Sequence, residues 1–287
     1  MARIIGSPSR YIQGKGTLAE ITKYTERLGK KLLILVSKSG KKRVEEKINK
    51  AVEGTDTTVV WEIFNGECSK SEVNRIGENL KKEKCDVVVG IGGGKILDTA
   101  KAVAYYEDIA VVCVPTAAST DAPCSALSVL YTDDGQFDEY LWLPANPDII
   151  LLDTDIIVAA PVRLIVSGMG DALATYFETR ACMRSNTTSC MGGSVSKTAM
   201  ALSELCFKTL MEDGAKALLA VNAGACTPAV ENIIEANTYL SGIGFESGGI
   251  AAAHAIHNGL TCIEETHGMY HGEKVAFGVL SQLVCFN

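Results

Sequence analysis

The sequence predicts an α/β protein with a second, all-helical part, and two patterns lead to this prediction. In the first half, apolar runs without polar alternation are separated by helical patterns, which is typical of a parallel sheet covered on both faces. Near residue 161 the pattern becomes helical throughout. We therefore expect a doubly wound, mostly parallel, Rossmann-like domain in 1–160 and a helical domain in 161–287. The latter stops inside an apolar helical pattern and is expected to be incomplete at its C-terminus.

The expected elements of the first half alternate along the chain. The strands are expected at 31–37, 57–64, 86–90 and 111–114. The helices are expected at 17–28, 41–52, 69–82 and 96–105. An Asp-Asp-Gly sequence at 133–135 then predicts a hairpin turn between two further strands.

Four helices are expected early in the second half, separated by glycine-rich turns. They are placed at 171–181, 194–210, 214–221 and 229–239. Asp171 follows Gly170 at the first of these, where the helix dipole favours a carboxylate, so helix capping is one interpretation of Asp171.

The composition excludes several classes of partner. A net charge of −7 disfavours nucleic acid and anionic membranes, which both attract basic surfaces. No signal peptide is expected, because Arg3 and Arg10 bracket too short an apolar segment. No membrane span is expected, because the most apolar stretch, at 147–166, is interrupted by charged residues. The ten cysteines contain no C-x-x-C pair and are expected to be reduced. We therefore expect a cytoplasmic protein.

All four histidines of the chain lie between residues 254 and 271. His254 and His257 are one turn apart on an expected helix, and His271 opens another apolar helical stretch. Imidazole is the commonest metal ligand and a proton shuttle near neutral pH. Buried histidines often only satisfy hydrogen bonds, but four in so short a segment favour a metal site.

A glycine-rich turn, GIGGGK at 90–95, follows the expected strand at 86–90 and precedes a helix. Such a turn lets backbone N–H groups approach a phosphate at a helix N-terminus. The dinucleotide fingerprint is imperfect, because Lys95 stands where its third glycine belongs, and Ile96 stands where a P-loop needs Ser or Thr. The turn disfavours ATP and leaves two interpretations: a pyrophosphate held by backbone and Lys95, or a tight turn without a ligand.

A polar loop follows the expected strand at 111–114. Its hydrogen-bonding side chains are Thr116, Ser119, Thr120, Asp121 and Ser125. Open α/β sheets bind ligands beyond the carboxyl ends of their strands, so this loop is a candidate ligand-binding segment.

Four motifs together resemble the iron- or zinc-dependent alcohol dehydrogenase family, and within it the glycerol dehydrogenase branch. They are GIGGGKILDTAK at 90–101, VPTAASTDAPCSALSVLY at 114–131, SGMGDALATYFE at 167–178, and AAAHAIHNGL followed by HGEKVAFG within 251–278. Their order and separations match the family over the whole chain, which is more specific than any single glycine loop.

The resemblance implies a metal site formed by Asp171, His254 and His271, with zinc in this branch. Two imidazoles and a carboxylate with one open position suit a catalytic zinc. Iron-type relatives carry a further histidine four residues after the aspartate, where this chain has Thr175. The resemblance therefore favours zinc over iron.

The resemblance also implies NAD as cofactor. The cofactor-binding residues that it assigns are Ser37, Gly92, Gly93, Gly94, Lys95, Asp98, Thr116, Ser119, Ser125, Leu127 and Tyr131. Of these, Ser125, Leu127 and Tyr131 match the nicotinamide end. The family often has Asp at position 37, where it binds the adenosine ribose and repels a 2′-phosphate. Ser37 weakens that selection, so tolerance of NADP is a hypothesis.

The resemblance implies reversible, NAD- and zinc-dependent oxidation of glycerol, or a similar small diol, to dihydroxyacetone. Asp121 would orient a second substrate hydroxyl. His257 or His267 would relay the proton or support a ligand, and support is the favoured role for His267. A homo-oligomer is also implied. Alternatives are a dehydrogenase for another polyol or for glycerol phosphate, and a truncated remnant without catalysis.

Overall fold

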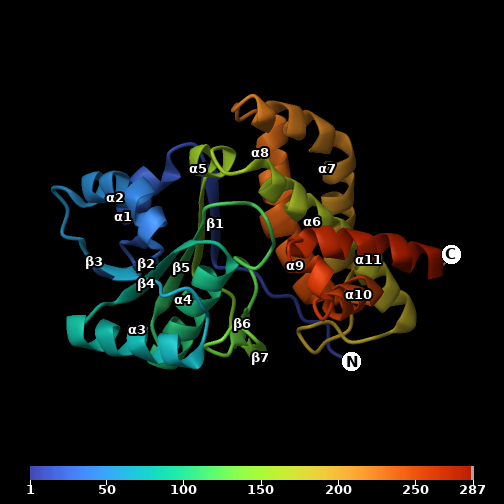
Figure 1. Cartoon of the computed structure of the whole chain (residues 1–287), viewed down its shortest axis with the longest axis horizontal. Coiled ribbons are helices and arrows are strands. Elements are labelled where there is room, and N and C mark those ends of the chain that lie inside the picture. Colours follow the sequence, from blue (N-terminus) through green and yellow to red (C-terminus); the bar gives the residue numbers. More distant parts are fainter. Residues whose placement is uncertain (286–287) are drawn as a thin grey trace. The chain divides into compact units, whose positions relative to one another are not determined.

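The structure, a computed structural model, describes residues 1–285 and divides into two compact units (Figure 1). The α/β unit is Pro8–Thr116 with Ser125–Ile157, and the helical unit contains the chain from Val158 onward. Two short segments, Met1–Ser7 and Ala117–Cys124, belong to the helical unit although a linear division at residue 160 places them elsewhere. Both segments are hydrogen-bonded to the rest of the helical unit: Ala2 O accepts the N–H of Ser194 at 2.8 Å, and Ala118 O accepts from Asn237 Nδ2 at 2.9 Å.

The α/β unit is built on a six-stranded sheet in which every pairing is parallel, in the order β1-β8-β5-β4-β2-β3. Its strands are β1 (Arg10–Gly14), β2 (Lys31–Val36), β3 (Thr58–Ile63), β4 (Val87–Gly92), β5 (Ala110–Pro115) and β8 (Ile149–Asp153). This confirms the predicted doubly wound fold. The pairing of β1 with β8 joins segments that no local pattern relates, and the predicted set of strands contained neither.

Helices flank this sheet, with α1 and α2 on one side of it in Figure 1 and α3 and α4 on the other. They are η1 (Thr17–Glu20), α1 (Ile21–Thr25), α2 (Lys38–Val52), α3 (Lys70–Glu83), α4 (Gly94–Glu107) and α5 (Thr154–Val158). Alternate residues of β2, such as Leu32 and Ile34, pack in one core with Val44 and Ile48 of α2. Leu33 and Leu35, which face the other way, are also fully buried, so both faces of this sheet bury apolar side chains.

The expected hairpin forms a separate two-stranded antiparallel sheet of β6 (Leu127–Tyr131) and β7 (Phe137–Trp142). A buried ion pair ties it to α4. Lys101 Nζ lies 2.9 Å from Asp98 Oδ1, while Asp98 Oδ2 accepts the backbone N–H of Val129 at 3.2 Å. The pair therefore anchors the hairpin to α4 within the α/β unit.

The helical unit contains seven further helical elements and a short 3-10 turn, η3 (Glu264–Thr266), among the described residues. They are α6 (Val162–Ser185), α7 (Lys197–Asn222), α8 (Pro228–Glu235), the π-helical turn η2 (Ala236–Leu240), α9 (Ser241–Gly248), α10 (Ala252–Leu260) and α11 (His271–Cys285). Among the described residues, no helix is long and apolar enough to cross a membrane.

Two expectations for these helices are wrong. Because α6 begins at Val162, Asp171 lies in its interior and does not cap its start. The helices expected at 194–210 and 214–221 are one continuous helix, α7, in which Gly214 is buried. A glycine inside a helix costs only about 1 kcal/mol relative to alanine, which the burial of neighbours such as Ala217 can offset.

Glycines set how closely α11 approaches its neighbours. A Cβ at Gly272 would lie 1.8 Å from Ser167 O in α6, and one at Gly278 would lie 2.3 Å from Ala253 O in α10. Real side chains do not occupy such distances from backbone atoms, so α11 packs directly on the backbones of two helices.

We predict that Gly278→Ala lowers the unfolding free energy by about 1–3 kcal/mol, because its Cβ would force α10 and α11 apart. Gly259→Ala in α10 is the matched control, since a Cβ there meets nothing within 4 Å. It is expected to gain about 0.5–1 kcal/mol from helix propensity. Denaturant unfolding of both variants checks this, and equal stabilities would contradict the close contact.

Candidate functional site

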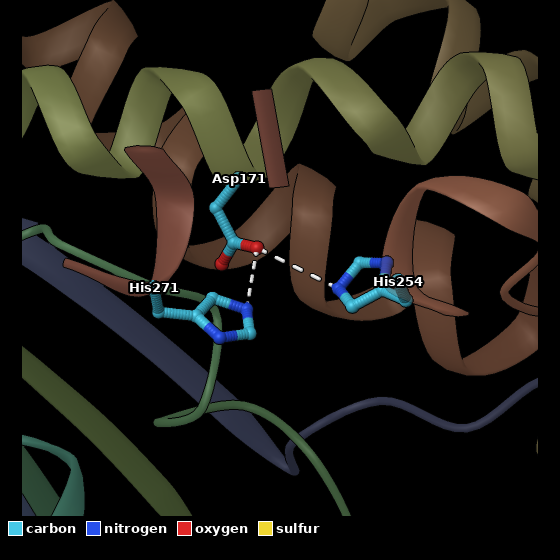
Figure 2. A group of neighbouring side chains, drawn as sticks. All are labelled: Asp171, His254 and His271. Carbon is cyan, nitrogen blue, oxygen red and sulfur yellow. Dashed lines mark ion pairs between the residues drawn. The ribbon is translucent and has the colours of Figure 1, made fainter. Parts of the chain in front are cut away.

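Three residues that the sequence analysis assigned to a metal lie together in the helical unit (Figure 2). Asp171 comes from α6, His254 from α10, and His271 is the first residue of α11. Nε2 of His271 lies 3.0 Å from Asp171 Oδ1, and Nε2 of His254 lies 3.7 Å from the same oxygen. One ligand atom from each residue lies within 4.8 Å of the others, and both rings point a nitrogen at the carboxylate.

Glu178 is a fourth member of this cluster, which the sequence analysis did not identify. Its Oε2 lies 2.6 Å from Nδ1 of His254. Its Oε1 accepts the backbone N–H groups of Ala251 at 2.8 Å and of His254 at 2.9 Å. The available signal was its position about two helical turns after Asp171, on the same face of α6.

The contact with Glu178 determines which nitrogen of His254 is available. An ionised carboxylate only accepts hydrogen bonds, so Nδ1 carries the proton. In a neutral ring Nε2 then presents a lone pair towards the carboxylate oxygen of Asp171. Two acceptors that face each other at a buried position need a positive charge between them.

The donor set fits a metal ion. Within the described part of the chain, neither oxygen of the buried Asp171 carboxylate accepts a well-formed hydrogen bond. Two imidazole nitrogens and one carboxylate oxygen are ligands that zinc accepts, and iron can use the same set. The three residues present here therefore fit a divalent transition metal.

The pKa values of these groups reflect the same charges. Burial alone would raise the pKa of Asp171, but the charge of His271 and the nearby His254 outweigh burial and lower it. Burial opposes a charged ring at His254, but Glu178 and Asp171 outweigh it, so the pKa of His254 is raised well above its ordinary value. A proton on His254 can therefore stand in for the metal charge.

The other two histidines lie in different surroundings. The buried His257 ring makes an edge contact with His271, with centroids 4.2 Å apart, and its Nδ1 lies 3.0 Å from Asn258 Oδ1. Burial, followed by the charge of His271, lowers the pKa of His257 to about 4. His267 is exposed and contacts the carbonyl of Thr261 at 3.1 Å. Only His257 thus touches a candidate ligand.

Asp121 lies in the loop segment that belongs to the helical unit, as does Ser119. Its Oδ2 accepts a hydrogen bond of 2.7 Å from Ser241 Oγ, and Ser241 Oγ lies 3.0 Å from Thr175 Oγ1. Burial and then the charge of Asp171 raise the pKa of Asp121 to about 7. Two hydroxyls therefore fix the orientation of this carboxylate.

The glycine-rich turn lies between β4 and α4 in the α/β unit. β4 ends at Gly92, Gly93 takes the N-cap position, and α4 begins at Gly94. A Cβ at Gly93 or Gly94 would meet nothing within 4 Å, so the space beside the turn is open. The first N–H groups of a helix have no partner within it, and the dipole favours an anion there. Thr116 is attached to this turn, since its N–H donates to Gly92 O at 3.1 Å.

Lys95 lies in the first turn of α4 and is held by two neighbours. Its Nζ lies 2.6 Å from Glu67 Oε2 and 5.2 Å from the centroid of the Tyr131 ring. The structure thus brings Lys95 and Tyr131 together, and it adds Glu67, which the sequence analysis did not identify. An anion at the turn would compete with Glu67 for Lys95.

Other residues predicted to contact the cofactor make structural contacts. Ser37 is the N-cap of α2, where its Oγ accepts the N–H of Gly40 at 3.0 Å. The Asp98 carboxylate is buried against Lys101, and Ser125 Oγ lies 3.4 Å from Lys101 Nζ. Leu127 is the first residue of β6. The geometry gives no support to a cofactor contact for Asp98.

Known proteins resemble this chain in sequence and in fold. A family model described as iron-containing alcohol dehydrogenase matches residues 8–154. A glycerol dehydrogenase of Escherichia coli is 51% identical over 287 residues, which is 100% of this chain and 78% of that protein.

Two solved structures resemble the fold. The structure of a probable glycerol dehydrogenase from Sinorhizobium meliloti has a TM-score of 0.91 at 46% identity, covering 98% of this chain and 78% of that one. The structure of a glycerol dehydrogenase from Schizosaccharomyces pombe has a TM-score of 0.93 at 42% identity, covering 99% of this chain and 72% of that one.

These similarities confirm the resemblance that the four sequence motifs indicated, and they extend over nearly the whole chain. The chain therefore belongs to the iron-containing alcohol dehydrogenase family of NAD-dependent oxidoreductases, and within it groups with the glycerol dehydrogenases.

Proposed function

We propose that this chain binds Zn²⁺ through Asp171, His254 and His271 and oxidises glycerol to dihydroxyacetone with NAD as hydride acceptor. The observation that supports this most is the buried Asp171 carboxylate facing two imidazole nitrogens. Three protein ligands leave one coordination position open, as catalytic zinc requires. Thr175 supports the three-ligand set, because its hydroxyl contacts Ser241.

The reaction transfers a hydride from the secondary carbon of glycerol to C4 of the nicotinamide and releases the hydroxyl proton. When bound, the metal supplies a Lewis acid that polarises the reacting oxygen and lowers the pKa of the hydroxyl. Asp121 holds a second hydroxyl of the substrate, which favours diols over simple alcohols. Ser241 donates to Oδ2 of Asp121, and the substrate hydroxyl is proposed to donate to Oδ1.

His257 is proposed to carry the released proton away. Its ring touches His271, and its pKa is lowered to about 4, so it is neutral at pH 7 and would hold the proton only in passing. A neutral imidazole can accept a proton and pass it on. The other role that its contacts allow is support of the His271 ring.

The pyrophosphate of NAD is proposed to bind at the turn of Gly92, Gly93 and Gly94. Backbone N–H groups and the N-terminus of α4 would hold its charge. Lys95 would break its ion pair with Glu67 and pair with the phosphate, so that one negatively charged partner replaces another.

Metal removal tests the proposal as a whole. We expect the purified protein to form NADH from glycerol, to lose at least about 90% of this activity after treatment with a chelator, and to recover it with Zn²⁺. Absorbance at the NADH band measures the rate, and Fe²⁺ added under anaerobic conditions tests the other metal. Turnover that persists in demonstrably metal-free protein would refute the role of the metal.

The ligand assignment predicts different results for two histidines. His254→Ala should lose bound zinc and lower kcat/KM at least about 100-fold, since it removes one of three ligands. His267→Ala is the matched control and should retain both, because His267 is exposed and its ring contacts the Thr261 carbonyl. Zinc content by elemental analysis and steady-state kinetics check this. A zinc-loaded, active His254→Ala protein is the result that excludes His254 as a ligand.

The cofactor preference is predicted to depend on position 37. Ser37→Asp should raise the ratio of kcat/KM for NAD to that for NADP roughly tenfold, because a carboxylate repels the 2′-phosphate. Ser37→Asn is the uncharged control. Asp, Asn and Ser are all good N-caps, so both variants should keep the stability of α2 to within a few tenths of a kcal/mol. An unchanged ratio in Ser37→Asp would place the ribose elsewhere.

A further inference from the structure

We propose that Glu178 is the positioning residue of the metal centre, where one buried carboxylate fixes the ring of His254 and the helix that carries it. This inference rests on the proposed function, since it concerns the metal that His254 would bind. Glu178 does not itself reach the other ligand atoms. It acts through His254.

Three N–H groups converge on the two oxygens of Glu178. Oε2 lies 2.6 Å from the ring Nδ1 of His254, and Oε1 accepts the backbone N–H groups of Ala251 and His254. The Glu178 side chain is only 1% exposed, so water contributes little to these contacts. Both oxygens of the carboxylate are therefore needed.

The backbone bonds cap α10 from another helix. α10 begins at Ala252, and its N-cap residue Ala251 has no side chain able to cap it. The first N–H groups of a helix need external acceptors, and a negative charge at that end is favoured by the helix dipole. Glu178 supplies the acceptor oxygen and the negative charge, and thereby fixes the position of His254 within the first turn of α10.

The ring bond fixes the orientation of the imidazole. With Nδ1–H held by Glu178, the lone pair of Nε2 points at Asp171. Figure 2 shows this ring nitrogen facing the Asp171 carboxylate. A carboxylate that accepts the second N–H of a metal-binding histidine is a recurring way to fix the ring and raise its basicity. Asp171 and Glu178 both lie on α6, so one helix positions a ligand and also the group that orients the next ligand.

Glu178→Gln separates these functions because glutamine has one acceptor oxygen where glutamate has two. That oxygen can serve the His254 ring or the helix cap, and the NH₂ group then opposes an N–H donor at the other place. We expect Zn²⁺ affinity, measured by competition with a chromophoric chelator, to fall about 10–100-fold. Glu178→Asp keeps both oxygens on a shorter side chain, so its Zn²⁺ affinity should lie between those of the wild-type protein and Glu178→Gln.

A second measurement reports on the ring itself. In zinc-loaded wild-type protein, the Nδ1–H proton of His254 should give a downfield, slowly exchanging resonance, assigned by its loss in His254→Ala. It should shift upfield or exchange rapidly in Glu178→Gln. Glu246→Gln in α9, which removes an equally buried carboxylate at 1% exposure, is the matched control and should change neither the resonance nor the zinc affinity.

The outcomes separate this inference from the proposed function. The role of Glu178 would be overturned if Glu178→Gln folds, binds zinc with wild-type affinity and keeps the His254 Nδ1–H resonance. This holds even if the thermal midpoint of the variant is lowered. If that variant does not fold, rapid exchange of the His254 N–H proton in the wild-type protein would overturn it instead. Wild-type protein that binds no zinc refutes the metal centre, while a protected N–H proton in that protein still supports the contact with Glu178.

Discussion

The direct backbone contact between α6 and α11 is the constraint on which the site depends. Gly170 precedes Asp171 in α6, and Gly272 follows His271 in α11. A Cβ at Gly170 would lie 2.5 Å from Gly272 O, and one at Gly272 would lie 2.9 Å from Asp171 N. Because two glycines meet here, the helices approach closely enough for the His271 ring to reach the carboxylate at 3.0 Å. Larger residues at either glycine would separate the two side chains.

Buried charge makes the packing of this unit depend on its site. The side chains of Asp171 and Glu178 are each 1% exposed, and a buried, unpaired carboxylate costs several kcal/mol. His254 lies between them and contacts both, so a positive charge at that ring interacts favourably with both carboxylates. The N-terminus of α10 and the proposed ligand His254 share the Glu178 carboxylate, so the proposed metal binding would be coupled to the stability of α10.

Local sequence patterns predicted the fold class because each buried strand must be apolar on both faces. They did not predict β1 and β8, whose pairing depends on a contact between Arg10–Gly14 and Ile149–Asp153. They also placed the start of α6 too late, because the glycine at 170 was interpreted as a break although burial overrides its low propensity.

The ligand set was implied by family resemblance, and the structure brings its three residues together. Glu178 was missed because a glutamate on a helix is usually solvated, and no local pattern shows that Ala251 and His254 will donate to it. Asp98, which the resemblance assigned to the cofactor, illustrates a different point. It lies in the glycine-rich motif, but its charge is matched by a buried lysine of the same helix.

Packing around Thr175 leaves no room for a further ligand beside the three proposed for the metal. Thr175 follows Asp171 by one turn of α6, is 2% exposed, and contacts Ser241 through its hydroxyl. A Cβ at Gly244 in α9 would lie 2.4 Å from the Thr175 methyl group, so α9 leaves no room for a larger side chain. A histidine at this position would have to displace α9 and would break the hydroxyl contact that orients Asp121 through Ser241. The same packing that excludes a fourth ligand therefore holds the carboxylate proposed to bind the substrate.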